Sequence, residues 1–135
     1  MTWCYGAPGI GLARLGALRH MEDARIREEL ERAVTVTLEK GFGKNHCICH
    51  GDLGNLDLLQ EVQRMTGDAK LGEAVARLSR TVLASIGKDG WLCGTVGGIE
   101  SPGLMNGLAG IGYGLLRLAA PDRVPSVLLM EPPRA

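Results

Sequence analysis

Residues 6–18 read GAPGIGLARLGAL, and the same design of spaced glycines leading into a leucine-rich helical pattern returns twice in the chain. Residues 51–65 read GDLGNLDLLQEVQRM, and residues 107–118 read GLAGIGYGLLRL. Alanine favours a helix by about 1 kcal/mol over each glycine, so the glycines serve close packing and not helix propensity. The pattern therefore predicts three helices whose ends pack tightly around a common axis.

Two amphipathic segments alternate with the glycine-led ones, and each carries an apolar stripe at helical spacing. The stripes consist of Ile26, Leu30, Ala33, Val34 and Leu38 in residues 22–40, and of Leu71, Val75, Leu78, Val82 and Ile86 in residues 68–86. Asp23 and Asp68 stand at the predicted starts of these helices, and Gly41 and Gly87 at their predicted ends. Both segments are expected to be outer helices with one buried side.

The leading glycines Gly6, Gly51 and Gly107 are 45 and 56 residues apart, so each unit is a glycine-led helix followed by an amphipathic one. Such self-similarity predicts stacked helical hairpins, with an inner ring of glycine-led helices and an outer ring of amphipathic ones. Two full units and one lone inner helix are present, so we expect open apolar faces that favour association.

Composition excludes several classes of function. The 135 residues suit one domain, and 15 basic against 15 acidic residues argue against binding to nucleic acid or to an anionic membrane. No run reaches the roughly 18 apolar residues of a membrane span. The first residues lack a secretory signal, so we expect a cytoplasmic protein whose four cysteines are thiols or metal ligands.

Two segments are not expected to be regular helices. Residues 87–106 contain six glycines and one proline, and such a long loop is either a cover over the ring or part of a functional site. Residues 121–135 contain four prolines around an apolar run at 124–130, which predicts an extended segment.

The chemically dense stretch is His46-Cys47-Ile48-Cys49-His50, which offers the two residue types that zinc prefers. One chain turn does not bring all four side chains onto one tetrahedron, so a further ligand must come from a distance. Cys4 is the natural candidate, because it precedes a glycine-led helix as Cys49 and His50 do. If the repeats stack side by side, these three residues converge. Cys47 and Cys93 are not expected to join them.

The residues alone leave other interpretations open. The cysteines could be buried packing groups, a redox thiol, or a nucleophilic Cys–His pair. Tyr5 could donate a hydrogen bond near a metal at Cys4, or be a buried tyrosine with a satisfied hydroxyl. The glycines of residues 6–11 do not predict a phosphate loop, since no strand precedes them and no Lys-Ser/Thr follows.

Three motifs carry a resemblance to a known family: residues 3–9 (WCYGAPG), 49–51 (CHG) and 107–113 (GLAGIGY). They resemble the lanthionine synthetase C-like cyclases. Residues 100–119 and 124–129 further resemble the C-terminus of the bifunctional class II lanthipeptide synthetases. The resemblance implies an all-α fold, a partial α/α toroid, with residues 1–135 as the C-terminal part of the cyclase domain.

The resemblance also implies a zinc ion held by Cys4, Cys49 and His50, with Tyr5 near the active site. The implied reaction is a Michael-type addition, in which a cysteine thiol of a dehydrated precursor peptide attacks dehydroalanine or dehydrobutyrine. A three-ligand protein site that leaves a fourth position for substrate is the catalytic zinc pattern. The substrate thiol must lose its proton to become a nucleophile, and coordination to zinc favours that loss.

Some features of the family pattern lie outside this sequence. The acid/base His and Asp belong to motifs upstream of the Trp-Cys motif, and neither the Arg before the zinc Cys nor the dehydratase domain is present. We therefore expect weak or no cyclase activity from this chain alone, with the remainder of the synthetase as a partner. The alternatives are a non-catalytic zinc-binding helical module, a glutathione-adding relative, and a plain helical-repeat scaffold.

Overall fold

The structure, a computed structural model, describes residues 1–132, which contain five α-helices, two short 3-10 helices and no strand. The α-helices are α1 (Ala7–Leu18), α2 (Ala24–Lys40), α3 (Asp52–Thr66), α4 (Ala69–Asp89) and α5 (Leu108–Ala119). The 3-10 helices are η1 (Val96–Gly98) and η2 (Val127–Leu129). The predicted all-α class is confirmed. No helix within residues 1–132 is long and apolar enough to cross a membrane.

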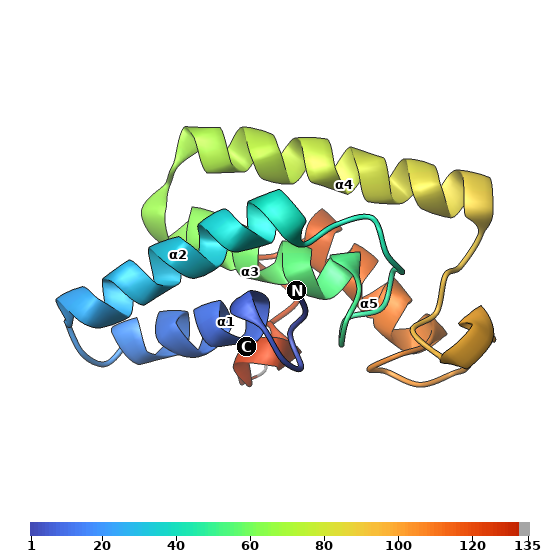
Figure 1. Cartoon of the computed structure of the whole chain (residues 1–135), viewed down its shortest axis with the longest axis horizontal. Coiled ribbons are helices and arrows are strands. Elements are labelled where there is room, and N and C mark those ends of the chain that lie inside the picture. The colour runs from blue at the N-terminus through green and yellow to red at the C-terminus, as the bar shows by residue number, and fades with distance from the viewer. Residues whose placement is uncertain (133–135) are drawn as a thin grey trace.

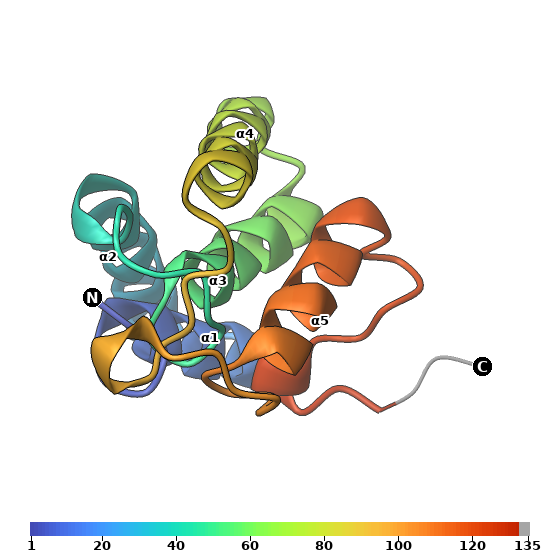
Figure 2. The same cartoon turned by 90° about the vertical axis from the view of Figure 1, so that its right-hand side faces the viewer.

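The helices form two layers, as the repeat pattern predicts. The glycine-led helices α1, α3 and α5 lie side by side in the inner layer, where α3 contacts both of the others (Figure 2). The amphipathic helices form the outer layer, with α2 packed on α1 and α4 packed on α3 (Figure 1). Helix α3 is the centre of the fold, because every residue from Asp52 to Val62 is buried.

Aspartate caps start both outer helices. Asp23 accepts hydrogen bonds from the backbone N–H groups of the first turn of α2, and Asp68 does the same for α4. The predicted end of the second outer helix at Gly87 is wrong, because α4 continues to Asp89. Gly87 has no steric or conformational feature that stops a helix, whereas Gly90 has a positive φ of 77° and ends it.

The spaced glycines of the inner helices have a specific steric role. In each inner helix the second glycine of the repeat touches the backbone carbonyl oxygen six residues earlier in the chain. A Cβ there would lie only 2.0 Å (Gly9 to Trp3), 1.9 Å (Gly54 to Ile48) or 1.7 Å (Gly110 to Leu104) from that oxygen. The segment before each inner helix therefore crosses the first helical turn, which only glycine permits.

Other glycines bring the inner helices themselves close together. A Cβ at Gly11 of α1 would lie 2.8 Å from the Leu58 side chain of α3, and one at Gly114 of α5 would lie 2.9 Å from Leu53 of α3. The predicted close packing of these helices is thus confirmed at these two contacts, on opposite sides of α3.

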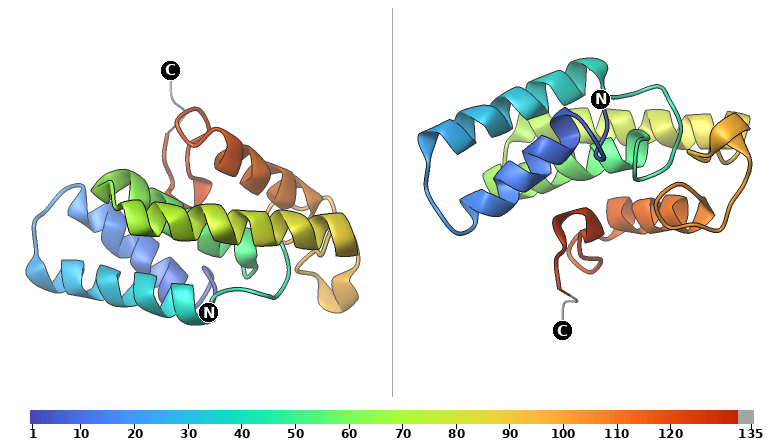
Figure 3. Two further views of the ribbon diagram at one scale, coloured as in Figure 1. Left: turned by 90° about the horizontal axis from the view of Figure 1, so that it is seen from above. Right: turned by 60° about the horizontal axis from the view of Figure 1, so that its bottom comes forward.

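The segment after α5 has no α-helix within its described residues, as its prolines predict, and its 3-10 helix η2 contacts α1 (Figure 3). The predicted extended form is wrong for most of residues 121–130, which form turns and η2, and the end of the predicted segment, 133–135, lies outside the described residues. A buried ion network attaches this segment to the inner layer. Arg117 of α5 is only 2% exposed and pairs with Asp57 and Glu61 of α3. Ser126 donates a hydrogen bond of 2.5 Å to the same Asp57 carboxylate. No local pattern in the sequence predicts this network.

Candidate metal centre

The segments before α1, α3 and α5 lie in register, and that register places Cys4 beside Cys49. The Cys4 N–H donates to the Cys49 carbonyl oxygen at 3.2 Å, and the Cys49 N–H donates to the Met105 carbonyl oxygen at 3.0 Å. Cys4, Cys49 and Met105 each stand two residues before the leading glycine of an inner helix. The same backbone position in successive repeats is therefore linked by hydrogen bonds, as stacking of the repeats requires.

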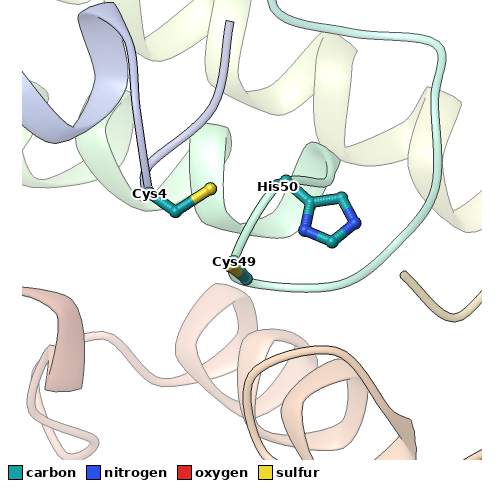
Figure 4. A group of neighbouring side chains, drawn as sticks. All are labelled: Cys4, Cys49 and His50. Atoms are coloured by element: carbon teal, nitrogen blue, oxygen red, sulfur yellow. The ribbon is translucent and has the colours of Figure 1, made fainter. Parts of the chain in front are cut away.

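Three candidate ligand residues come together at this point. The ligand atoms of Cys4, Cys49 and His50 all lie within 4.8 Å of one another, and Figure 4 shows the two thiols and the imidazole facing a common region. The Cys4 side is exposed, whereas Cys49 and His50 are partly buried. The cluster is therefore anchored in the fold on one side and reachable from solvent on the other.

The N-terminal segment that carries Cys4 is held by hydrogen bonds to α3 and within itself. The buried Asn55 side chain of α3 donates to the Met1 carbonyl oxygen at 3.2 Å. The Thr2 hydroxyl donates to the Tyr5 carbonyl oxygen at 2.8 Å, which closes a turn around Cys4. The Thr2 hydroxyl also lies 3.6 Å from the Cys4 sulfur.

The two thiols of the cluster differ in acidity. Burial acts to raise the pKa of Cys4, but its polar contacts with the Thr2 hydroxyl, with Cys49 and with the backbone outweigh burial and lower that pKa. Burial raises the pKa of Cys49 to about 11, and its hydrogen bond to Cys4 and the charges of the neighbouring thiols add to the rise. Cys4 is thus the more acidic thiol of the pair.

His46, Cys47 and Cys93 lie outside the cluster, in line with the registration argument. His46 is enclosed, and its ring nitrogens contact the Leu92 N–H at 3.1 Å and the Ser85 hydroxyl at 3.0 Å. Cys47 and Cys93 are buried free thiols. The Cys47 sulfur accepts a hydrogen bond from the His50 N–H at 3.4 Å, so it contacts the cluster without belonging to it.

Tyr5 is not the buried tyrosine that the residues alone left open. Its side chain is 81% exposed and directly follows Cys4 in the chain. An exposed phenol beside an exposed thiol is free to meet a molecule that approaches the cluster. The role of Tyr5 at an active site stays a prediction.

The donor set fits a zinc ion. Two thiols and one imidazole are among the ligands that zinc prefers, and three protein ligands are the number found in catalytic sites. Donor atoms of a tetrahedral site with two sulfurs and one nitrogen lie about 3.5 to 3.8 Å apart, given the usual Zn–S and Zn–N bond lengths. The separations of up to 4.8 Å therefore close by about 1 Å. Small rotations of the side chains are enough for such a movement.

Comparisons with known proteins give one matching family and a related synthesis protein. The sequence profile of the family described as lanthionine synthetase C-like protein matches residues 1–129. The lacticin 481/lactococcin biosynthesis protein LcnDR2 of Lactococcus lactis subsp. lactis is 31% identical over 128 residues. That match covers 85% of this chain but only 14% of the relative. No solved structure matches the chain.

Proposed function

The chain belongs to the lanthionine synthetase C-like family, and from that premise we propose that it carries the thiol-activating centre of a lanthipeptide cyclase. Its inner and outer helices are part of the α/α toroid of that family. The observation that supports the proposal most directly is the convergence of Cys4, Cys49 and His50 at an accessible point of the surface. These three residues would hold the zinc ion.

The proposed substrate is a dehydrated precursor peptide, and the reaction forms a thioether within it. The sulfur of a substrate cysteine bonds to the β-carbon of dehydroalanine or dehydrobutyrine, and a proton is added to the α-carbon. No group leaves, so the mass of the peptide does not change. When bound, zinc supplies the positive charge that allows the substrate thiol to lose its proton near neutral pH.

The charges of the protein ligands suit this task. Two thiolates and a neutral imidazole together carry two negative charges, which balance a divalent cation. An attacking thiolate therefore stays electron-rich, as a nucleophile must. The exposure of Cys4 leaves this side of the cluster open to the peptide, and the exposed Tyr5, the next residue in the chain, would contact the peptide there.

A proton donor for the α-carbon is not found among the histidines of the chain. His50 belongs to the cluster, and His46 is enclosed with both ring nitrogens engaged. His20 follows the far end of α1, about 18 Å from its start at the usual helical rise. We therefore propose that the acid/base groups come from another part of the cyclase, and that this chain alone cyclises weakly or not at all.

That proposal includes a partner: the remainder of the synthetase, with residues 1–135 as the C-terminal part of the cyclase domain. The chain spans 14% of the length of the Lactococcus lactis relative, which leaves most of such a protein to supply the partner. Large apolar side chains lie half-exposed on helices of both layers, among them Ile10, Leu83 and Leu116. We expect the remaining helical hairpins of the synthetase to cover these side chains. We place the reaction in the cytoplasm, where thiols remain reduced.

The test uses a synthetic peptide with one cysteine and one dehydroalanine, incubated with the zinc-loaded chain and a polypeptide that carries the preceding cyclase helices. Cyclisation is followed by mass spectrometry as loss of reactivity toward a thiol-alkylating reagent without a change in peptide mass. We expect cyclisation by the mixture, little by the chain alone, and none by a mixture containing Cys49→Ala. Cys93→Ala is the matched control, because Cys93 is a buried thiol outside the cluster.

Two results would contradict the proposal. Efficient cyclisation by the chain alone would show that it needs no partner. Cyclisation that survives Cys49→Ala would remove the cluster from the reaction. Addition of glutathione to the dehydrated residue would instead increase the peptide mass, so the same experiment separates ring formation from the glutathione-adding alternative.

A further inference from the structure

We propose that Gly94, in the loop between α4 and α5, positions the imidazole of His50 so that its Nδ1 faces the two cysteine sulfurs. The inference rests on the proposed metal centre and adds to it a residue that supplies no ligand. Gly94 is one of six glycines in the stretch 87–106, and nothing in its local sequence distinguishes it.

The first observation is the space around Gly94. A Cβ on this residue would lie 2.5 Å from the Cys47 sulfur, 2.7 Å from His50 Nε2 and 2.9 Å from His50 Cε1. All three distances are shorter than van der Waals contact. The backbone of Gly94 therefore lies directly against the edge of the imidazole that carries Nε2.

This contact decides which ring nitrogen is presented to the cysteines. Figure 4 shows one nitrogen of His50 on the side of the sulfurs and the other pointing away from them. The nitrogen on the sulfur side is bonded to the ring carbon that joins the side chain, so it is Nδ1. The nitrogen on the far side is Nε2, which is the atom next to Gly94. The loop thus supports the ring from the side opposite to the proposed metal.

The second observation is that neither Gly94 nor its neighbours can retreat easily. The Gly94 N–H donates to the Asn106 carbonyl oxygen at 2.8 Å. Two residues earlier, Leu92 and His46 exchange hydrogen bonds, one from the His46 N–H to the Leu92 carbonyl at 2.8 Å and one from the Leu92 N–H to His46 Nδ1 at 3.1 Å. The loop is therefore held at Gly94 itself and two residues before it.

The His50 imidazole is therefore the group that moves when a side chain is added at position 94. Cys47 is fully buried, and its sulfur is held by the His50 N–H, so it has no free volume to enter. Gly94 does not have a positive φ, so alanine fits its backbone conformation without strain. A methyl group at position 94 would displace the partly exposed imidazole and turn Nδ1 away from the sulfurs.

The experiment compares Gly94→Ala with Gly103→Ala, a control in the same loop whose Cβ would meet only Ser101 at an ordinary 3.6 Å. Zinc affinity is measured by competition with a chromophoric chelator, and ligand geometry by the absorption spectrum of the cobalt-substituted chain. We expect Gly94→Ala to weaken zinc binding about 10- to 100-fold, as for other changes that reorient a ligating histidine. The control should bind as the unsubstituted chain does. Equal affinity of all three proteins would overturn the inference.

A second measurement uses the unsubstituted chain, so it does not require that a variant binds metal. Nitrogen-15 NMR of the histidine rings in the unsubstituted zinc-loaded chain should show the metal on Nδ1 of His50 and the proton on Nε2, and the reverse assignment would overturn the inference. If the unsubstituted chain binds no zinc, the proposed function fails on its own. In that case the His50 ring signals of the metal-free chain should still shift in Gly94→Ala and not in Gly103→Ala, and an unchanged spectrum would refute the role of Gly94.

Discussion

Replacement of Gly54 by alanine tests the steric reason for the glycine repeat. Gly54 lies in α3, where the segment that carries Cys49 and His50 crosses the first helical turn. A Cβ there would lie 1.9 Å from the Ile48 carbonyl oxygen and 2.8 Å from its carbonyl carbon. Both atoms are backbone, so no rotation of a side chain relieves the overlap.

The size of the effect follows from two opposing contributions. Alanine gains about 1 kcal/mol over glycine from helix propensity. Relief of the overlap requires the Ile48 backbone to move by more than 1 Å from its position at 1.9 Å, and Ile48 is in the core. Overpacking of this kind costs about 1 to 3 kcal/mol or more. Because the overlapping Ile48 atoms are backbone, we expect a cost at the upper end of this range, about 3 kcal/mol, and so a net loss of about 2 kcal/mol or more in the free energy of unfolding.

Gly112→Ala is the matched control, because Gly112 lies within the inner helix α5 and a Cβ there would meet nothing within 4 Å. It should raise the free energy of unfolding by about 0.5 to 1 kcal/mol. The assay is urea denaturation followed by far-ultraviolet circular dichroism. Gly54→Ala should also weaken zinc binding, since Ile48 immediately precedes Cys49. The steric reasoning is refuted if Gly54→Ala unfolds at the same or a higher urea concentration than the unsubstituted chain.

Two further predictions concern buried polar groups. Arg117→Met should lower the free energy of unfolding by about 3 to 5 kcal/mol, because it leaves the buried carboxylate of Asp57 without its cation, whereas Glu61 keeps its ion pairs with Arg19 and Arg64. A loss below 1 kcal/mol in a urea titration would show that the network is not needed. Below pH 6.5, stability should decrease as His46 becomes protonated, since burial lowers its folded pKa from 6.5 and its Nδ1 accepts the Leu92 N–H. The contribution is present above the unfolded pKa and is lost as the pH falls from there toward the folded pKa. His46→Gln should flatten the pH dependence of the urea midpoint, and an unchanged dependence would contradict this assignment.

Much of the fold follows from local signals in the sequence. The stripes of apolar residues predict the two outer helices, and Asp68 caps the second of them as expected, whereas Asp23, expected in the first turn, is the cap of the first. The three glycine-led segments all form inner helices, with Gly6, Gly51 and Gly107 as their N-caps. The convergence of Cys4 and Cys49 follows from repeat registration, because both stand two residues before a leading glycine.

Other features depend on tertiary contacts that no local pattern contains. Gly87 resembles a helix stop in sequence, but whether a glycine ends a helix is decided by its backbone conformation, and the stop is Gly90. Asp57 and Arg117 are 60 residues apart, and only the pairing of α3 with α5 brings them together. The contact between Gly94 and His50 exists only once the loop is folded, so no local pattern in the sequence identifies Gly94.

The central claim is that Cys4, Cys49 and His50 form one metal centre, and a zinc stoichiometry measured on four proteins tests it most directly. The purified chain, Cys4→Ala, Cys49→Ala and Cys93→Ala are each dialysed against buffered zinc and analysed by plasma mass spectrometry. We predict one tightly bound zinc per chain in the unsubstituted protein and in Cys93→Ala, and a large loss of affinity in the other two. Zinc near zero in the unsubstituted chain, or zinc retained equally in all four, would contradict the claim.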